Sequence, residues 1–159
     1  MFNQAVQVIF LHEGGYVDHK SDPGGCTNYG ISQRAYPEVD IYNLTKERAK
    51  HIYLRDYWKP LSLYMLDNAN ICLELFDFAV NAGPSRAVKL AQKLAGTKED
   101  GQLGGITANA INKFEGDFVK VFKHARIIYY ESLARNNHNL KMFLNGWINR
   151  VNGNYFINI

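Results

Sequence analysis

Apolar residues recur at helical spacing along most of this chain, and glycine or proline begins or ends several of these stretches. Phe2, Val6 and Ile9 share one face of a helix expected over residues 2–13, and Gly14 is its natural stop because glycine adopts the left-handed cap without strain. Hydrophobic residues make up 47% of the 159 residues and charged residues 21%, the balance of a globular protein with a sizeable core. The pattern therefore predicts a mainly α fold.

Further helices are expected along the rest of the chain. Thr45 can cap a helix that runs to about Trp58, and residues 71–82 are apolar almost all round, which indicates a buried central helix. The remaining expected helices cover residues 84–95, a short segment capped by Thr107, residues 117–136 and residues 140–151. Residues 96–107 form a turn-rich connector in this interpretation.

The segment after the first helix is long and rich in glycine. Residues 14–31 have no helical pattern, and we expect them to form a loop or a small hairpin around Tyr16 and Tyr29. A loop of this length in a compact domain usually serves a function. The segment is therefore the first place to look for a catalytic site.

Two carboxylic acids in this region have contrasting surroundings. Glu13 lies at helical spacing from Ile9 on the apolar face, where a carboxyl group is costly to ionise. Asp22 precedes Pro23-Gly24-Gly25 in a polar turn, where it is easily kept ionised. Such a pair is typical of glycoside hydrolysis, and Thr27 could hold the water molecule. The alternative is that Asp22 caps a turn and Thr27 bonds to the backbone.

Five motifs resemble those of glycoside hydrolase family 108, the N-acetylmuramidases of phages and bacteria. They are EGGY at residues 13–16, DPGGCTNYGI at 22–31, FDFAVNAGP at 76–84, DGQLGGIT at 100–107 and FLNGWINRV at 143–151. Together they span nearly the whole chain. The resemblance implies a lysozyme-like helical fold, with a glycine-rich catalytic loop or small hairpin after the first helix.

The same resemblance implies the roles of individual residues. Glu13 is implied as the catalytic acid, and Asp22 and Thr27 are similar in position to the aspartate and threonine of phage-type lysozymes. Residues 1–95 would form the catalytic region, and residues 96–159 a peptidoglycan-binding region packed with it as one compact unit. The expected reaction is hydrolysis of the β-1,4 bond between N-acetylmuramic acid and N-acetylglucosamine. No metal or organic cofactor is implied.

Several side chains are candidates for contact with the sugar chain. Tyr16 and Tyr29 flank the catalytic loop and could stack on sugar rings. Asp77 and Asn81 lie with Glu74 on one face of the central helix, where they could hydrogen-bond a substrate. The alternative for these three is a helix edge that simply faces water.

Two residues near the C-terminus receive structural interpretations. Trp147 follows the apolar spacing of Phe143 and Val151, so it is expected in the core. Arg150 could pair with a substrate carboxylate, but such an arginine more often braces neighbouring helices.

Charge, cysteine and histidine content narrow the class of protein. A net charge of +3 is too small and too scattered to indicate nucleic-acid binding, although it favours adhesion to a polyanion such as a cell wall. The two cysteines, Cys26 and Cys72, are expected as free thiols, and the five histidines form no metal-binding motif.

The expected partner is bacterial peptidoglycan, bound by a monomer without insertion into a membrane, because no apolar run approaches the ~18 residues of a membrane span. The N-terminal residues lack a basic region and a cleavage site, so we expect synthesis in the cytoplasm without a signal peptide. Action in the periplasm or cell wall would then follow release, with a pore-forming holin as a candidate partner for export.

Two other functions are compatible with the sequence. One is a non-catalytic cell-wall-binding or secretion-associated protein on a lysozyme-like scaffold, and the other is a hydrolase that acts on chitin. A pure binding protein has no need for the pair formed by Glu13 and Asp22, whereas either hydrolase does.

Overall fold

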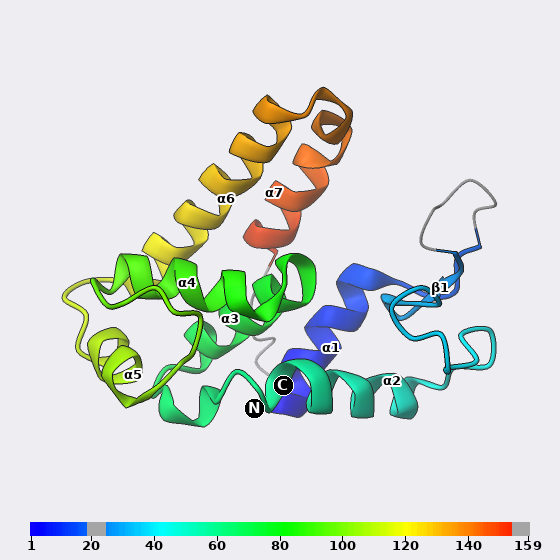
Figure 1. Ribbon diagram of the computed structural model, residues 1–159, viewed down its shortest axis with the longest axis horizontal. Coiled ribbons are helices and arrows are strands. Elements are labelled where there is room, and N and C mark those ends of the chain that lie inside the picture. The colour runs from blue at the N-terminus through cyan, green and yellow to red at the C-terminus, as the bar shows by residue number, and fades with distance from the viewer. Residues whose placement is uncertain (19–24, 154–159) are drawn as a thin grey trace. The chain divides into compact units, whose positions relative to one another are not determined.

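The computed structural model describes residues 1–18 and 25–153, and it confirms the mainly α fold (Figure 1). The chain forms two compact units, Met1–Asp56 and Tyr57–Ile159. We call them unit 1 and unit 2. These structural units do not test the predicted division into a catalytic region (residues 1–95) and a peptidoglycan-binding region (residues 96–159). That division stays a prediction.

Unit 1 combines two helices with a small β-hairpin. Its elements are α1 (Phe2–Glu13), β1 (Thr27–Asn28), β2 (Ile31–Ser32) and α2 (Lys46–Tyr53), followed by the π-helical turn η1 (Leu54–Trp58) that leads into unit 2. The Thr45 side chain caps α2 as predicted, because its Oγ1 accepts a hydrogen bond of 3.3 Å from the Arg48 backbone N–H. The regular α-helix ends at Tyr53 and not at Trp58, since the last turn widens into η1.

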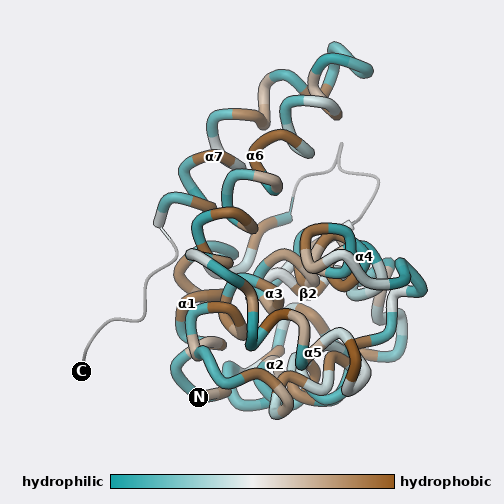
Figure 2. Tube along the Cα trace, turned by 90° about the vertical axis from the view of Figure 1, so that its left-hand side faces the viewer, coloured by the Kyte–Doolittle hydropathy of each residue, from teal (hydrophilic) through white to brown (hydrophobic). Residues whose placement is uncertain are grey.

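Unit 2 is a helical assembly around α3. Its elements are η2 (Leu63–Met65), α3 (Ala69–Ala82), α4 (Pro84–Leu94), α5 (Gly105–Asn112), α6 (Phe118–Asn136), η3 (His138–Phe143) and α7 (Leu144–Asn152). α6 and α7 lie side by side and are joined by η3 (Figure 1). Apolar and polar stretches alternate along both helices, as expected for helices that bury one face (Figure 2).

The short helix α5 begins differently from the prediction. Gly104 is its N-cap residue, and Thr107 lies inside the first turn, where it is buried. The prediction that Thr107 caps this helix is therefore wrong. The Thr107 hydroxyl serves another purpose, because it accepts a hydrogen bond of 3.3 Å from the buried Gln92 side chain.

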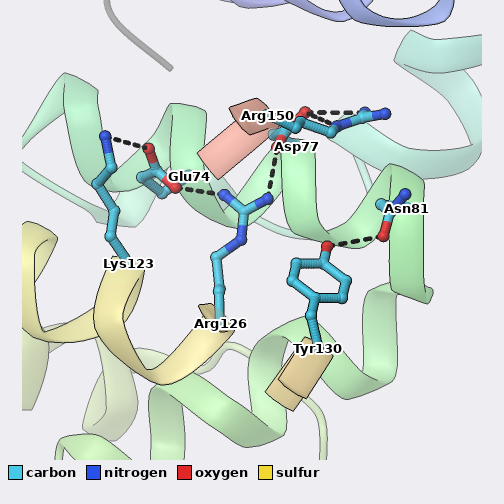
Figure 3. Close-up of polar contacts among 7 residues, drawn as sticks. All are labelled: Glu74, Asp77, Asn81, Lys123, Arg126, Tyr130 and Arg150. Carbon is cyan, nitrogen blue, oxygen red and sulfur yellow. Dashed lines mark hydrogen bonds and ion pairs between the residues drawn. The ribbon is translucent and has the colours of Figure 1, made fainter. Parts of the chain in front are cut away.

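Buried charges connect α3 to α6 and α7. Arg126 of α6 donates to both Glu74 and Asp77 of α3, with 2.6 Å to the Asp77 Oδ2 atom. Arg150 of α7 donates from Nε to Asp77 Oδ1 at 2.9 Å, and Lys123 Nζ lies 3.7 Å from Glu74 (Figure 3). Glu74, Asp77 and Arg126 are almost completely buried, so each charge depends on the others for compensation.

Burial acts against the charge of Glu74. Desolvation raises the pKa of Glu74, and the nearby Arg126 and Lys123 only partly oppose the shift. The folded state therefore binds the Glu74 proton more tightly than the unfolded chain does. The contribution of Glu74 to stability is greatest below its unfolded pKa of about 4.3, and it declines as the pH rises through the folded value.

We predict that Glu74→Gln gains stability relative to the wild type as the pH rises from about 4 to about 7, because glutamine cannot ionise. Thermal unfolding of both proteins across this range measures the difference. Glu131→Gln, at an exposed position of α6, is the control and should show a constant difference. A stability difference that shifts in favour of the wild type as the pH rises would contradict the prediction. It would mean that attraction to Arg126 and Lys123 exceeds the cost of burying the Glu74 charge.

Candidate active site

Glu13 is the last residue of α1, and the chain turns immediately after it. Gly14 adopts a positive φ of 70°, and its backbone N–H donates to the Phe10 carbonyl at 3.2 Å. The turn requires glycine, because side chains other than glycine are strained at this φ. The Glu13 side chain is partly exposed, so it is held by the protein and remains accessible to solvent.

The chain returns to Glu13 through a tight hairpin. β1 and β2 are antiparallel, with Thr27 opposite Ser32 and Asn28 opposite Ile31, so the turn consists of Tyr29 and Gly30. Both turn residues have positive φ, 51° and 76°, which is the signature of a type I′ turn. This confirms the predicted hairpin. Tyr29 is unusual at such a φ, and the contacts described below explain how it is held there.

Val17 adds a short bridge on the other side of β1. Its backbone N–H and carbonyl both pair with Thr27 at 2.8 Å. The segment that leaves α1 is therefore tied to the strand that carries Thr27. Thr27 itself is partly buried, and its backbone pairs with both Val17 and the β2 strand.

The tightest contact of the region joins Glu13 to the turn. A Cβ atom added at Gly30 would lie 2.6 Å from Glu13 Cγ, 2.8 Å from Glu13 Cδ and 2.6 Å from the Tyr53 hydroxyl. No side chain fits in this space. The side chain of Glu13 therefore lies directly against the backbone of the turn, which restricts where its carboxyl group can point.

Aromatic side chains hold the turn in this place. The Tyr53 hydroxyl of α2 donates to the Tyr29 carbonyl at 2.8 Å. The Phe10 ring of α1 packs edge-on against the rings of Tyr29 and Tyr53, with centroids 5.4 and 6.0 Å apart. α1, the hairpin and α2 thus meet at the Glu13 side chain, and this stabilises the positive φ of Tyr29.

Asn28 anchors the hairpin to the following segment. Its buried side-chain amide donates to the carbonyls of Ile41 and Leu44, at 3.1 and 3.4 Å. None of Asn28, Gly30 and Tyr53 is among the site residues predicted from the sequence. Asn28 and Gly30 lie inside the motif at residues 22–31, so this motif was the available signal, whereas Tyr53 had only its place on the apolar face of its helix.

The other predicted residues of unit 1 have different positions. Asp22 lies outside the described residues. Tyr16 is 42% exposed, and its ring packs edge-on against Tyr42, which is 71% exposed, at a centroid distance of 5.3 Å. This pair offers two accessible aromatic faces from the segments before and after the hairpin, and Tyr42 is an addition that the sequence did not suggest.

The predicted residues of α3 have contrasting roles. Asp77 is fully buried and bonds to Arg126 and Arg150, so it has no exposed oxygen with which to contact a sugar. This geometry gives Asp77 a role in packing and does not support its predicted contact with substrate. Asn81 is exposed, and its side-chain oxygen accepts a hydrogen bond of 2.7 Å from the Tyr130 hydroxyl. Arg150 braces two helices, as expected.

Comparison with known proteins adds to this geometry. The profile of the glycosyl hydrolase 108 family matches residues 6–83, and the profile of a predicted peptidoglycan domain matches residues 86–152. The solved structure of SagA from Brucella abortus is 34% identical to this chain, with a TM-score of 0.80 over 95% of this chain and 89% of that chain. The chain belongs to the glycosyl hydrolase 108 family. A comparison with curated proteins gives no match.

Membership of the glycosyl hydrolase 108 family confirms the resemblance seen in the five motifs and the lysozyme-like fold. Both profile matches support a glycoside hydrolase that acts on peptidoglycan. The first profile covers Glu13, the hairpin and α3, and the second begins within α4.

The motif at residues 100–107 of this glycosyl hydrolase 108 protein is organised by Gln92. The buried Gln92 amide nitrogen donates to Asp100 Oδ1 at 2.8 Å, to the Gln102 carbonyl at 3.0 Å and to Thr107 Oγ1 at 3.3 Å. Its oxygen accepts from the Gly101 N–H at 2.9 Å. The motif therefore fixes the connector between α4 and α5 onto α4, and Gln92 at its centre is not among the residues predicted from the sequence.

Within residues 1–18 and 25–153, no cluster of three or more His, Cys, Asp or Glu side chains is arranged to hold a metal ion. Cys26 and Cys72 are both free, and burial raises the pKa of the Cys72 thiol to about 11. None of the helices that the structure describes has the length and apolar character that a membrane span requires.

We predict that Gly30→Ala lowers peptidoglycan hydrolysis by about 10²-fold, because the new methyl group displaces Glu13 and small errors in position are costly to catalysis. Gly96→Ala is the matched control: Gly96 also has a positive φ, 68°, but no atom lies within 4 Å of the added Cβ. Gly96→Ala should lose about 1 kcal/mol of stability from the strained backbone, and Gly30→Ala should lose more because its methyl group also meets Glu13 and the Tyr53 hydroxyl. Release of reducing sugar from purified peptidoglycan measures activity. Full activity in Gly30→Ala would show that the turn does not control Glu13.

Proposed function

We propose that this protein is an N-acetylmuramidase that hydrolyses the β-1,4 bond between N-acetylmuramic acid and N-acetylglucosamine. The observation that carries the proposal is the packing of Glu13 against the Tyr29–Gly30 turn, within the residues matched by the glycosyl hydrolase 108 profile. A carboxyl group that is held against the backbone of a turn, and that is still partly exposed, is suited to proton donation.

The catalytic steps follow from the residue types. Glu13 donates a proton to the glycosidic oxygen as the bond to the leaving sugar breaks. Asp22 remains ionised and stabilises the positive charge that develops on the muramic acid ring. Thr27 orients the water molecule that attacks this ring, and the proton that the water loses passes to the Asp22 carboxylate and then to solvent, from which Glu13 takes up a new proton. The position of Thr27 in β1 ties its backbone by hydrogen bonds to the segment that leaves Glu13.

Aromatic rings supply the expected contacts with the glycan. Tyr16 and Tyr42 form an exposed edge-on pair in the segments on either side of the hairpin. Stacking of a sugar ring on a tyrosine buries apolar C–H surface without desolvating the sugar hydroxyls that point sideways. We assign the sugar-stacking role to this pair, and we assign Tyr29 to positioning, because its carbonyl and ring are both engaged.

The substrate determines where the protein acts. Peptidoglycan lies in the periplasm or cell wall, so the proposed activity requires the protein to reach that compartment, with a holin as the candidate route. The proposal requires neither a metal nor an organic cofactor, and it requires only one copy of the chain.

We predict that Glu13→Gln lowers the cleavage of purified peptidoglycan by about 10²-fold or more, because the amide keeps the shape of the side chain but cannot donate the proton. Glu38→Gln, at an exposed position of the same unit, is the control and should keep full activity. The circular dichroism spectrum and melting temperature of both variants check that the fold is retained.

The products decide between the candidate functions. Borohydride reduction of the digest should convert new reducing ends to the alcohol of N-acetylmuramic acid. Reduced N-acetylglucosamine ends would instead identify a glucosaminidase, and faster cleavage of chitin would identify a chitin-active enzyme. A wild-type protein that binds peptidoglycan without releasing any reducing end would support the non-catalytic alternative.

A further inference from the structure

Two neighbouring cavities on unit 2 share residues of α4. The first has a volume of about 350 Å³ and is lined by residues 82–86 and Lys89. The second has a volume of about 150 Å³, and its lining includes Arg86, Lys89 and Lys93 together with Glu99 and Tyr129. Arg86 and Lys89 thus border both hollows.

The side chains between these cavities carry a net positive charge. Arg86, Lys89 and Lys93 follow one another at helical spacing on one face of α4, and all three are exposed. We call these three residues the basic stripe. Glu99 is the acidic residue in the lining, and within the described part of the chain no carboxylate forms an ion pair with the stripe. The stripe therefore presents cations that the fold itself does not neutralise.

The stripe is positioned by contacts with the protein. Arg86 Nη1 donates to the Ala82 carbonyl at 2.7 Å, and its guanidinium group lies 5.6 Å from the centre of the Tyr129 ring. The backbone of Gly101 approaches so closely that an added Cβ would lie 3.4 Å from Lys89 Cε and 2.5 Å from Ser85 Oγ. Gly101 is in turn fixed by its N–H bond to Gln92. The motif at residues 100–107 thereby restricts where Lys89 can point.

We propose that the basic stripe binds the free carboxylates of the peptidoglycan stem peptides. The inference rests on the proposed function in one respect, namely that peptidoglycan is the substrate. The stripe covers about 10 Å along the helix axis, at 1.5 Å per residue, which suits several carboxylates of one short peptide. A guanidinium group binds a carboxylate through two parallel hydrogen bonds, and lysines add point charges beside it.

This assignment divides recognition between two parts of the polymer. The sugar chain of peptidoglycan is mostly uncharged, whereas its stem peptides end in carboxylates. The stripe begins where the predicted peptidoglycan domain begins, at residue 86, and Glu13 lies in the region of the glycosyl hydrolase 108 profile. In this proposal the predicted peptidoglycan domain binds the stem peptide, and the region of the glycosyl hydrolase 108 profile cleaves the glycan.

The test uses a ligand without a glycosidic bond. A synthetic stem tetrapeptide with free carboxyl groups is titrated into the ¹⁵N-labelled full chain, and its dissociation constant is read from NMR shift changes. The same peptide with its carboxyl groups amidated is titrated in parallel. The amidated peptide should bind about tenfold more weakly, because it carries no negative charge for the stripe.

Variants with matched charge locate the site. Lys89→Gln with Lys93→Gln should weaken binding of the free peptide about five- to tenfold. Lys113→Gln with Lys141→Gln removes the same charge from exposed positions outside both cavities and should leave binding unchanged. Lys93→Gln alone is included because Lys93 is exposed, so this variant tests the site even if the double variant does not fold.

The results separate the two proposals. Equal binding of both peptides, no binding by the wild type, or the same loss in both double variants would overturn the assignment of the stripe. None of these outcomes depends on hydrolysis. Failure of Glu13→Gln to lose cleavage would overturn the catalytic proposal and would leave the binding result intact.

Discussion

Two carboxylates buried on α3 set the packing of unit 2. A buried carboxylate is tolerated only when cations and hydrogen bonds replace the water that it has lost. Asp77 meets this requirement through Arg126 of α6 and Arg150 of α7, whereas Glu74 meets it only in part through Arg126. The three helices pack in the register that brings these side chains together. The desolvation cost of these buried groups offsets much of the attraction between them, so the network adds little net stability.

Unit 1 depends on a close approach instead of on buried charge. The absence of a side chain at Gly30 lets the Glu13 side chain lie against the hairpin turn, and the hydroxyl of Tyr53 reaches the neighbouring carbonyl. The turn needs positive φ at two successive residues, and Phe10 and Tyr53 hold the less suitable of them, Tyr29, in place. The candidate acid is therefore positioned by backbone geometry, which is more rigid than a set of flexible side chains would be.

The motif at residues 100–107 shows how a polar cluster without a catalytic group can shape an exposed surface of unit 2. The Gln92 side chain forms hydrogen bonds with Asp100 and with the backbone of Gly101. The Gly101 backbone then lies close to Ser85 and Lys89. In this way a motif with no exposed catalytic group still shapes the surface on which the basic stripe lies. The glycosyl hydrolase 108 profile and the predicted peptidoglycan profile match successive parts of this chain, and the proposals above give them distinct chemical tasks.

The sequence by itself determined the helices, their glycine and proline ends, the hairpin after Glu13 and the family, because these follow from local periodicity, turn chemistry and contiguous motifs. The sequence did not determine which groups the polar side chains of Asp77, Gln92 and Thr107 contact. Polar spacing on a helix looks the same whether it faces water, a ligand or a buried cation, and the partners of Asp77 lie 49 and 73 positions away in the chain. The tertiary structure made that choice, since only packing brings distant charges and hydrogen-bond donors to buried groups that must be satisfied.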